Sequence, residues 1–175
     1  MMDGLMGLHE SVRDFMATGG DVLWLVAAAL ALTWILMLER FLFLRTEFPR
    51  LQARMVAQWQ ARPERRSWTA RRVRETLLSQ ARVELNARMG LIGALVAICP
   101  MLGLLGTVTG MITVFEVMAA HGTGNPRMMA SGISMATIPT MCGMVAALSG
   151  VFFSARLTAK IKVAGQRLND HLPFD

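Results

Sequence analysis

The residues of this 175-residue chain that could do chemistry are hydroxyl side chains set within two apolar runs, at 91–115 and 131–155. The hydroxyls of interest and the one acid beside them are Thr107, Thr109, Thr113, Glu116, Ser134, Thr137 and Thr140. Hydroxyl groups donate and accept hydrogen bonds, so they can orient water or pass a proton along. They do not titrate near neutral pH, and neither run contains Asp, Glu, His, Lys or Arg.

The two runs therefore indicate the wall of a proton pathway that lacks its own titrating group. Glu116 stands at the end of its run, which is typical of an interface residue more than of a central relay. If protons cross a bilayer here, the titrating group must come from a partner helix inserted among these helices. The competing interpretation is that each hydroxyl bonds a carbonyl of its own helix, as Ser and Thr in membrane helices often do.

Counting outward from a loop centred near residue 125 predicts which side chains share a depth, because each helical residue rises ~1.5 Å. The predicted levels are Glu116 with Ser134, Thr113 with Thr137, and Thr107 within about one turn of Thr140. Three matched levels favour a proton-pathway lining made of Thr107, Thr113, Thr137, Thr140 and Glu116.

Small residues indicate that the two runs pack against protein. In lipid no hydrophobic force draws helices together, and small residues let helix backbones approach closely. The expected helix-packing positions are Gly103, Gly106, Gly110 and Gly143. Pro100 and Pro139 each remove a backbone hydrogen bond and are expected to kink their helices.

Three apolar runs, at 22–38, 91–115 and 131–155, approach or exceed the length that crosses a ~30 Å hydrocarbon layer. They predict an all-α, multi-pass membrane protein with three transmembrane helices. The chain is 54% hydrophobic yet has a net charge of +6, which also raises the possibility of nucleic-acid binding. The placement of the basic residues favours a membrane protein instead.

Of the 18 Lys and Arg residues, 16 lie at position 40, within 45–88 or after 155, and only Arg13 and Arg127 lie elsewhere. Cytoplasmic loops carry the Lys and Arg excess of membrane proteins. The N-terminus and the loop between the last two spans are therefore predicted to be periplasmic, and the Arg-rich segment and tail cytoplasmic. The start, Met1 to Gly4, has no basic region typical of a signal peptide, so we expect the first apolar run to be retained.

The predicted order of segments follows from these runs. It is a periplasmic amphipathic helix at 1–20, a transmembrane helix at 21–44, a basic helical cytoplasmic segment at 45–90, a second transmembrane helix at 91–119, a periplasmic loop at 120–130, a third transmembrane helix at 131–155 and a cytoplasmic tail at 156–175. Apolar residues recur every four positions from Val73 to Met89. We therefore expect one long second helix that begins in the cytoplasm and continues unbroken into the membrane, and we expect Asp21 to cap the first span.

The segment PMLGLLGTVTGM, residues 100–111, resembles the second-span signature of the MotA/TolQ/ExbB proton channel family, particularly its ExbB and TolQ members. The segment GISMATIPTMCGMVAALSG, residues 132–150, is similar to the family's last helix, and Glu39-Arg40 also resembles the family. The resemblance implies a bacterial inner-membrane homo-oligomer, five subunits in the family, around helices of a smaller ExbD-like partner that supplies a membrane Asp. It further implies that the proton motive force energises a TonB-like protein for transport across the outer membrane.

The resemblance also places two pore-lining threonines of the family at Thr107 and Thr140. Met135 stands where ExbB proteins often carry Glu, so the channel wall is less acidic here than in that subgroup. A MotA-type stator is a poorer match because it usually has four spans and a larger cytoplasmic domain.

Two other functions stay open from the sequence. One is a TolQ-like subunit that serves outer-membrane integrity, and the other is a non-conducting membrane scaffold that stabilises its partner. An enzyme is not expected, because no zinc motif, nucleophile with a base or paired carboxylates occur in or near the spans. Cys99 and Cys142 are expected to be small buried hydrophobes, and no cofactor or metal site is expected.

Overall fold

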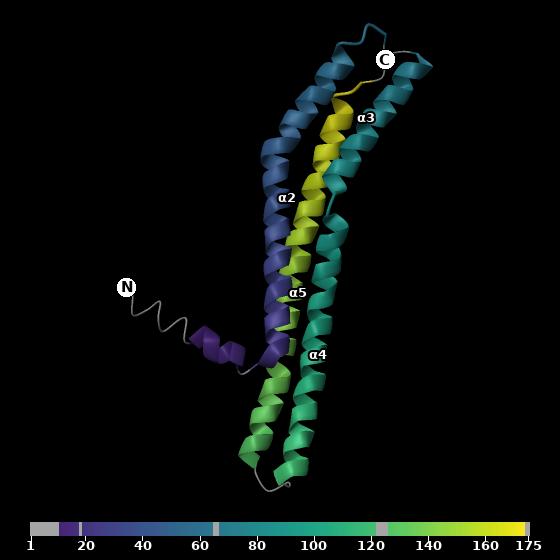
Figure 1. Cartoon of the computed structure of the whole chain (residues 1–175). Coiled ribbons are helices and arrows are strands. Elements are labelled where there is room, and N and C mark those ends of the chain that lie inside the picture. Colours follow the sequence, from purple (N-terminus) through teal and green to yellow (C-terminus); the bar gives the residue numbers. More distant parts are fainter. Residues whose placement is uncertain (1–10, 18, 65–66, 122–125, 174–175) are drawn as a thin grey trace, which may run out of the picture. The chain divides into compact units, whose positions relative to one another are not determined.

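The chain is a set of long helices, and a computed structural model describes residues 11–17, 19–64, 67–121 and 126–173 of it (Figure 1). Residues 11–17 are helical. The longer helices are α2 (Gly20–Gln60), α3 (Trp68–Asn86), α4 (Met89–His121) and α5 (Pro126–Asp170). Among the described residues, three helical segments are long and apolar enough to cross a membrane: Gly20–Gln60, Trp68–Ala120 and Met129–Asp170. This confirms the predicted all-α class with three spans.

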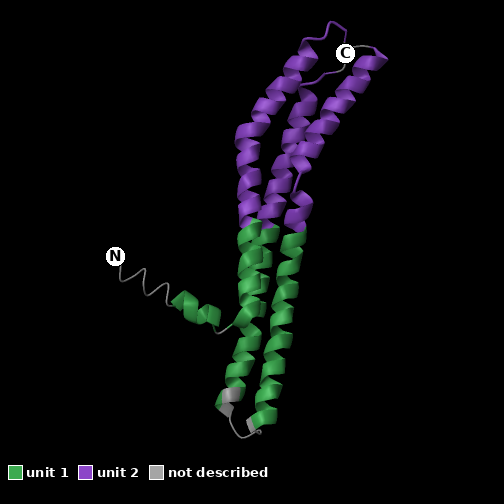
Figure 2. Ribbon diagram, in the orientation of Figure 1, with its two compact units in different colours: residues 1–33, 94–151 green, residues 34–93, 152–175 purple. Residues whose placement is uncertain are grey.

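The helices belong to two compact units, coloured separately in Figure 2. The first unit contains the described residues of Met1–Thr33 and Ala94–Val151, and the second those of Trp34–Gly93 and Phe152–Asp175. In the first unit the start of α2 packs with α4 and α5. Its core cluster consists of Val26, Cys99, Ala146 and Ala147, with Ala29, Leu30, Leu102 and Cys142 packed against it.

The buried stripes of α4 and α5 in the first unit advance in steps of mostly three and four residues. On α4 the buried positions are Val96, Cys99, Gly103, Gly106, Gly110 and Val114. On α5 the stripe is formed by Gly132, Ala136, Pro139, Gly143, Ala146 and Gly150, and Ala147 beside it is also buried. Alternating steps of three and four give an apolar seam of the kind that packs two helices at a small crossing angle. We call these residues the α4–α5 seam.

In the second unit, the later part of α2 packs with α3 and the end of α5. Buried apolar side chains come from all three segments: Met55, Trp59, Leu77, Ala81, Leu85, Leu157, Ile161 and Leu168. Polar contacts join the same segments, since Arg40 Nη1 donates to the Glu84 carbonyl at 3.1 Å and Glu39 forms an ion pair with Arg88. Continuous apolar periodicity along each helix is what makes this three-helix packing possible.

α3 and α4 are separate helices, so the expectation of one unbroken helix is wrong at Ala87 and Arg88. Ala87 has an extended ψ of 136°, and Arg88 has a positive φ of 63°, a conformation that is uncommon for Arg. The Glu39 carboxylate pairs with the Arg88 side chain, and Arg40 takes up one of the last carbonyls of α3. Side chains of α2 thus stabilise the interruption between α3 and α4. The spacing of apolar residues every four positions from Val73 to Met89 could not predict it.

The N-terminal predictions are only partly within the described residues. Leu5 and Leu8 of the expected amphipathic helix lie outside them, while Val12 and Phe15 are exposed in the helical segment 11–17. α2 begins at Gly20, whose φ is 68°, so Asp21 lies in the first turn and not at the cap. A negative charge in the first turn still interacts favourably with the helix dipole.

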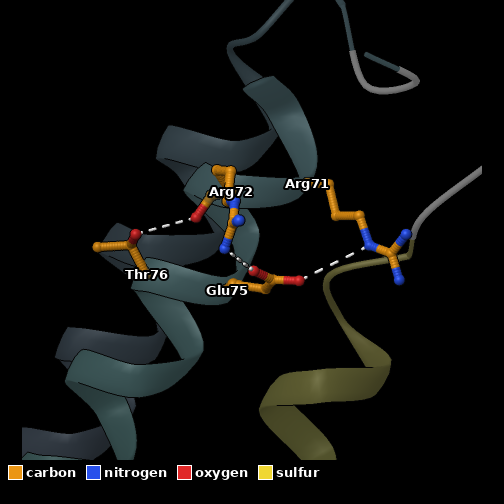
Figure 3. A network of polar contacts seen from close by, with 4 residues as sticks. All are labelled: Arg71, Arg72, Glu75 and Thr76. Carbon is orange, nitrogen blue, oxygen red and sulfur yellow. Dashed lines mark hydrogen bonds and ion pairs between the residues drawn. The ribbon is translucent and has the colours of Figure 1, made fainter. Parts of the chain in front are cut away.

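Two kinds of polar contact on α3 contribute differently to stability. Figure 3 shows Glu75 between Arg71 and Arg72, with N–O distances of 3.6 and 3.4 Å on side chains that are more than half exposed. Exposed pairs of this kind contribute little. Arg74 instead reaches the end of α5, where it donates to Asn169 Oδ1 at 2.9 Å, and it also donates to the carbonyl of Leu172, just beyond the helix, at 2.6 Å. Arg74 therefore ties the last turn of α5 to α3.

We expect Arg74→Ala to loosen the end of α5, because the charge-assisted bonds to Asn169 and Leu172 are lost. Hydrogen exchange of the amides at 167–172 should quicken by an amount equivalent to about 1–3 kcal/mol. Arg71→Ala is the matched control, with an expected change of about 0.5 kcal/mol or less. Equal exchange in the two variants would contradict the assigned role of Arg74.

Candidate functional site

The candidate site is built on a backbone contact between α4 and α5. A methyl group added at Gly110 would lie 2.5 Å from the Ala136 Cα, and one added at Gly143 would lie 2.6 Å from the Cys99 carbonyl oxygen. At Gly103 the added carbon would meet the Thr140 Cα at 3.0 Å. The two helices approach so closely here that only a hydrogen fits at these positions, which is the use of small residues expected in lipid.

Gly106 provides the space for a proline ring. A methyl group at Gly106 would clash with the Cβ of Pro139 and would lie 2.9 Å from its Cγ. Pro139 is fully buried, and both α4 and α5 continue through their prolines. Pro139 has no N–H for the carbonyl four residues before it, that of Met135. The ring thus fixes the relative height of the helices and leaves a helical carbonyl without its usual donor.

One hydroxyl joins the two helices directly. Thr140 Oγ1 donates to the carbonyl oxygen of Gly103 at 2.9 Å, and the Thr140 side chain is half-buried. The bond occupies the hydroxyl hydrogen and leaves the oxygen lone pairs able to accept from a water or an acid. Thr140 is therefore both a packing residue and an available acceptor.

The other predicted hydroxyls bond carbonyls of their own helices, as the competing interpretation expected. Thr107 Oγ1 donates to the Leu104 carbonyl at 2.7 Å, Thr113 to that of Thr109 at 3.2 Å, and Thr137 to that of Ile133 at 3.2 Å. Thr107 is half-buried, whereas Thr113, Thr137 and Glu116 are exposed. The hydroxyl hydrogens are satisfied within the helix, and only the oxygen lone pairs face outward.

The depth pairing agrees with the prediction at one level and differs at two. Gly106 contacts Pro139, so Thr107 and Thr140 share a level. Gly110 contacts Ala136, which places Thr113 opposite Ile133 and Thr137 about one turn, or ~6 Å, further from the loop. By the same register Glu116 and Ser134 are also about one turn apart. The shift arises because α4 ends at His121 and α5 begins at Pro126, so the turn is centred nearer 123 than 125.

Thr107 and Thr140 also lie on one flank of the helix pair. Each follows a seam residue by one position, Gly106 on α4 and Pro139 on α5. Each residue of a right-handed helix is rotated by about 100° from the one before it. When two antiparallel helices face each other, this rotation moves the residue after a seam position toward the same side of the pair on both helices. The structure therefore brings these two threonines to a common level and flank.

Two features of this site were not predicted from the sequence. The packing of the Pro139 ring against Gly106 was not predicted, although both residues were named. A proline in a helix predicts a kink or an interruption of the helix and gives no indication of which residue its ring will contact. The packing of Gly132 on Val114 and Gly150 on Val96 was also missed. The sequence pattern that could have predicted these contacts is the spacing of small residues along α5, which alternates between three and four positions.

The cysteines and acids offer no metal centre in the part of the chain that the structure describes. No group of three or more His, Cys, Asp or Glu side chains gathers there. Cys99 is buried with its thiol donating to the Leu95 carbonyl at 3.3 Å, and Cys142 is half-buried, both as free thiols. Their environment is that of small apolar side chains.

Comparison with known proteins agrees with the resemblance seen in the sequence. Residues 44–170 match the MotA/TolQ/ExbB proton channel family, a span that includes all of α3, α4 and α5. A 75-residue segment is 36% identical to the biopolymer transport protein exbB1 of Vibrio cholerae serotype O1. That segment covers 42% of this chain and 33% of the Vibrio protein, so the likeness extends over about a third of that relative's length.

The α4–α5 contact makes a sharp prediction for glycine substitutions. Gly110→Ala places a methyl group against the Ala136 backbone and should lower the free energy of unfolding by about 1–3 kcal/mol. Gly93→Ala is the control on the same helix, since its added methyl meets nothing within 4 Å, and should stabilise by up to about 1 kcal/mol through helix propensity. Unfolding in mixed micelles of mild detergent and dodecyl sulfate measures both. Two variants of equal stability would refute the contact.

Proposed function

Since this chain belongs to the MotA/TolQ/ExbB proton channel family, we propose that it forms the wall of a proton pathway in a motor complex of the bacterial inner membrane. The family is one of proton channels, and the three apolar helices make the chain a multi-pass membrane protein. One observation on this chain itself supports the proposal in addition to its family membership. Thr107 and Thr140 share a level and a flank of the α4–α5 pair, whose apolar runs at 91–115 and 131–155 contain no Asp, Glu, His, Lys or Arg.

The proposed mechanism assigns the wall a relay role. A protonated water or acid donates its proton to an oxygen lone pair of Thr140 or Thr107. The hydroxyl hydrogen then leaves the carbonyl that held it, that of Gly103 or Leu104, and passes to the next acceptor, so each hydroxyl releases one proton for each one it receives. Because neither hydroxyl can store a charge, the group that carries the proton belongs to a partner. A carboxylate on an ExbD-like partner helix, placed opposite these threonines, completes the pathway.

The exposed faces of α4 and α5 support an assembly around that partner. Large apolar side chains on both helices are exposed in the single chain, among them Leu104, Val108, Val145 and Leu148. We propose that further copies of the chain and the partner helices cover part of this surface, and lipid the rest. The N-terminus lies in the periplasm and the basic segments in the cytoplasm, in accordance with the distribution of Lys and Arg.

The proposed output is the energising of a TonB-like protein for transport across the outer membrane. One elementary charge moving down ~100 mV releases about 2.3 kcal/mol, so several protons suffice for a substantial conformational change. A TolQ-like role in outer-membrane integrity uses the same wall and differs in the protein driven. Complementation of strains lacking either ExbB or TolQ separates the two roles.

A non-conducting scaffold is the second candidate, and the own-helix bonds of Thr107, Thr113 and Thr137 favour it. A scaffold depends on the seam glycines and tolerates loss of the hydroxyls. A relay requires the hydroxyls as well as the glycines. The two candidates therefore differ in their response to substitutions that remove an oxygen and keep the side-chain volume.

We expect Thr140→Val to lower energised iron–siderophore uptake by about tenfold or more, equivalent to at least ~1.4 kcal/mol on the barrier. Thr107→Val should act in the same direction, while Thr140→Ser retains uptake because it keeps the oxygen. Thr158→Val is the control, since Thr158 also bonds its own helix, at the Ser154 carbonyl, outside the proposed pathway. Membrane levels of each variant are measured in parallel. Normal uptake in both valine variants at positions 107 and 140 would favour the scaffold.

A further inference from the structure

A groove of about 490 Å³ lies between α2 and α5 within the second unit. Its size is within the range of small-ligand sites. Its lining includes Trp34, Leu38 and Phe41 of α2 and Phe152, Phe153, Arg156 and Lys160 of α5. We call it the aromatic groove. The proton pathway proposed above uses none of these residues.

The groove has an apolar end and a cationic end. At the apolar end the rings of Trp34 and Phe153 are 4.8 Å apart between centroids, and Phe152 meets Phe153 edge to face at 5.3 Å. At the other end, Lys160 Nζ lies 4.6 Å from the centre of the Phe41 ring, and the Arg156 guanidinium carbon 5.3 Å from that of Phe152. The aromatic rings hold both cations at the mouth of the groove by cation–π attraction.

The two ends coincide with a boundary in the composition of both helices. The uncharged run of α2 ends at Leu38, and that of α5 ends at Ala155. Trp34 and Phe153 come before this boundary, while Lys160 comes after it, and the contacts above place the two helices at the same height. A tryptophan at such a boundary is typical of the membrane–water interface. The apolar end thus lies at acyl-chain depth, and the cationic end at headgroup depth.

The cations lack acidic neighbours in the groove. A second groove of about 580 Å³ shares Phe41, Arg156 and Lys160 and adds Arg45 and Arg167. Within the described residues, neither groove is lined by an Asp or a Glu. An occupant that complements this surface has an apolar tail and a negative head. Basic pockets between membrane helices on the cytoplasmic side have the same chemistry as sites for anionic lipid heads.

We propose that the aromatic groove binds an anionic phospholipid, with an acyl chain against Trp34 and Phe153 and the phosphate held by Arg156 and Lys160. The preference for an anionic over a zwitterionic headgroup comes from the two cations. The apolar end binds the chain of either lipid. Both cationic side chains are exposed, so replacing them leaves the helix packing intact.

The experiment uses the full chain in nanodiscs of phosphatidylcholine that contain a minor share of phosphatidylglycerol, with retained lipid counted by native mass spectrometry. We expect the protein to retain phosphatidylglycerol in excess of its share. The double variant Arg156→Gln, Lys160→Gln should lower that excess by about tenfold. The matched control Arg82→Gln, Lys162→Gln removes the same charge from a different groove and should keep the excess.

Two results would overturn the proposal. The first is an equal excess in all variants, or no excess in the unaltered chain, since the groove would then confer no lipid preference. The second concerns a second copy of the chain as occupant. If the Phe152→Cys variant forms an intermolecular disulfide in high yield, with or without phosphatidylglycerol, then a second copy of the chain covers the groove.

Discussion

The close backbone contact between α4 and α5 is the constraint on which the rest of the candidate site depends. In a bilayer, lipid tails solvate apolar side chains as well as other helices do, so association rests on close packing. Gly110 against Ala136 and Gly143 against Cys99 allow that approach, and the Pro139 ring against Gly106 sets the height. The Thr140 bond to the Gly103 carbonyl exists only because the helices are this close.

The contact determines what chemistry the wall can offer. It brings Thr107 and Thr140 to one level and flank. Hydroxyls there can pass a proton and cannot keep one. In the proposed function these hydroxyls pass protons on without storing them, and for that reason the pathway requires a carboxylate from another chain. The aromatic groove, which lies within the basic second unit, is a separate surface and is proposed to bind anionic lipid.

The helices and the family were predictable from residue order because both depend on local patterns. Long apolar runs bounded by charges define the spans, and the LGLLGTV core marks the family. The interruption at Arg88 was not predictable, because it is held by Glu39 and Arg40 from another helix. The register was in error by about one turn, because the loop count assumed a turn two residues too far along the chain. Hydrogen-bond partners of the threonines depend on that register and on helix proximity, neither of which a single sequence specifies.

If α4 and α5 pass protons along but depend on a partner for the acid that carries them, proton flux in liposomes should depend on that partner. The purified chain is reconstituted alone and together with an ExbD-like partner, and the decay of an imposed pH gradient is followed with a fluorescent dye. We expect no specific flux for the chain alone, and we expect a flux with the partner that falls when the partner's membrane Asp is replaced by Asn. Specific dissipation of the gradient by the chain alone would contradict this expectation.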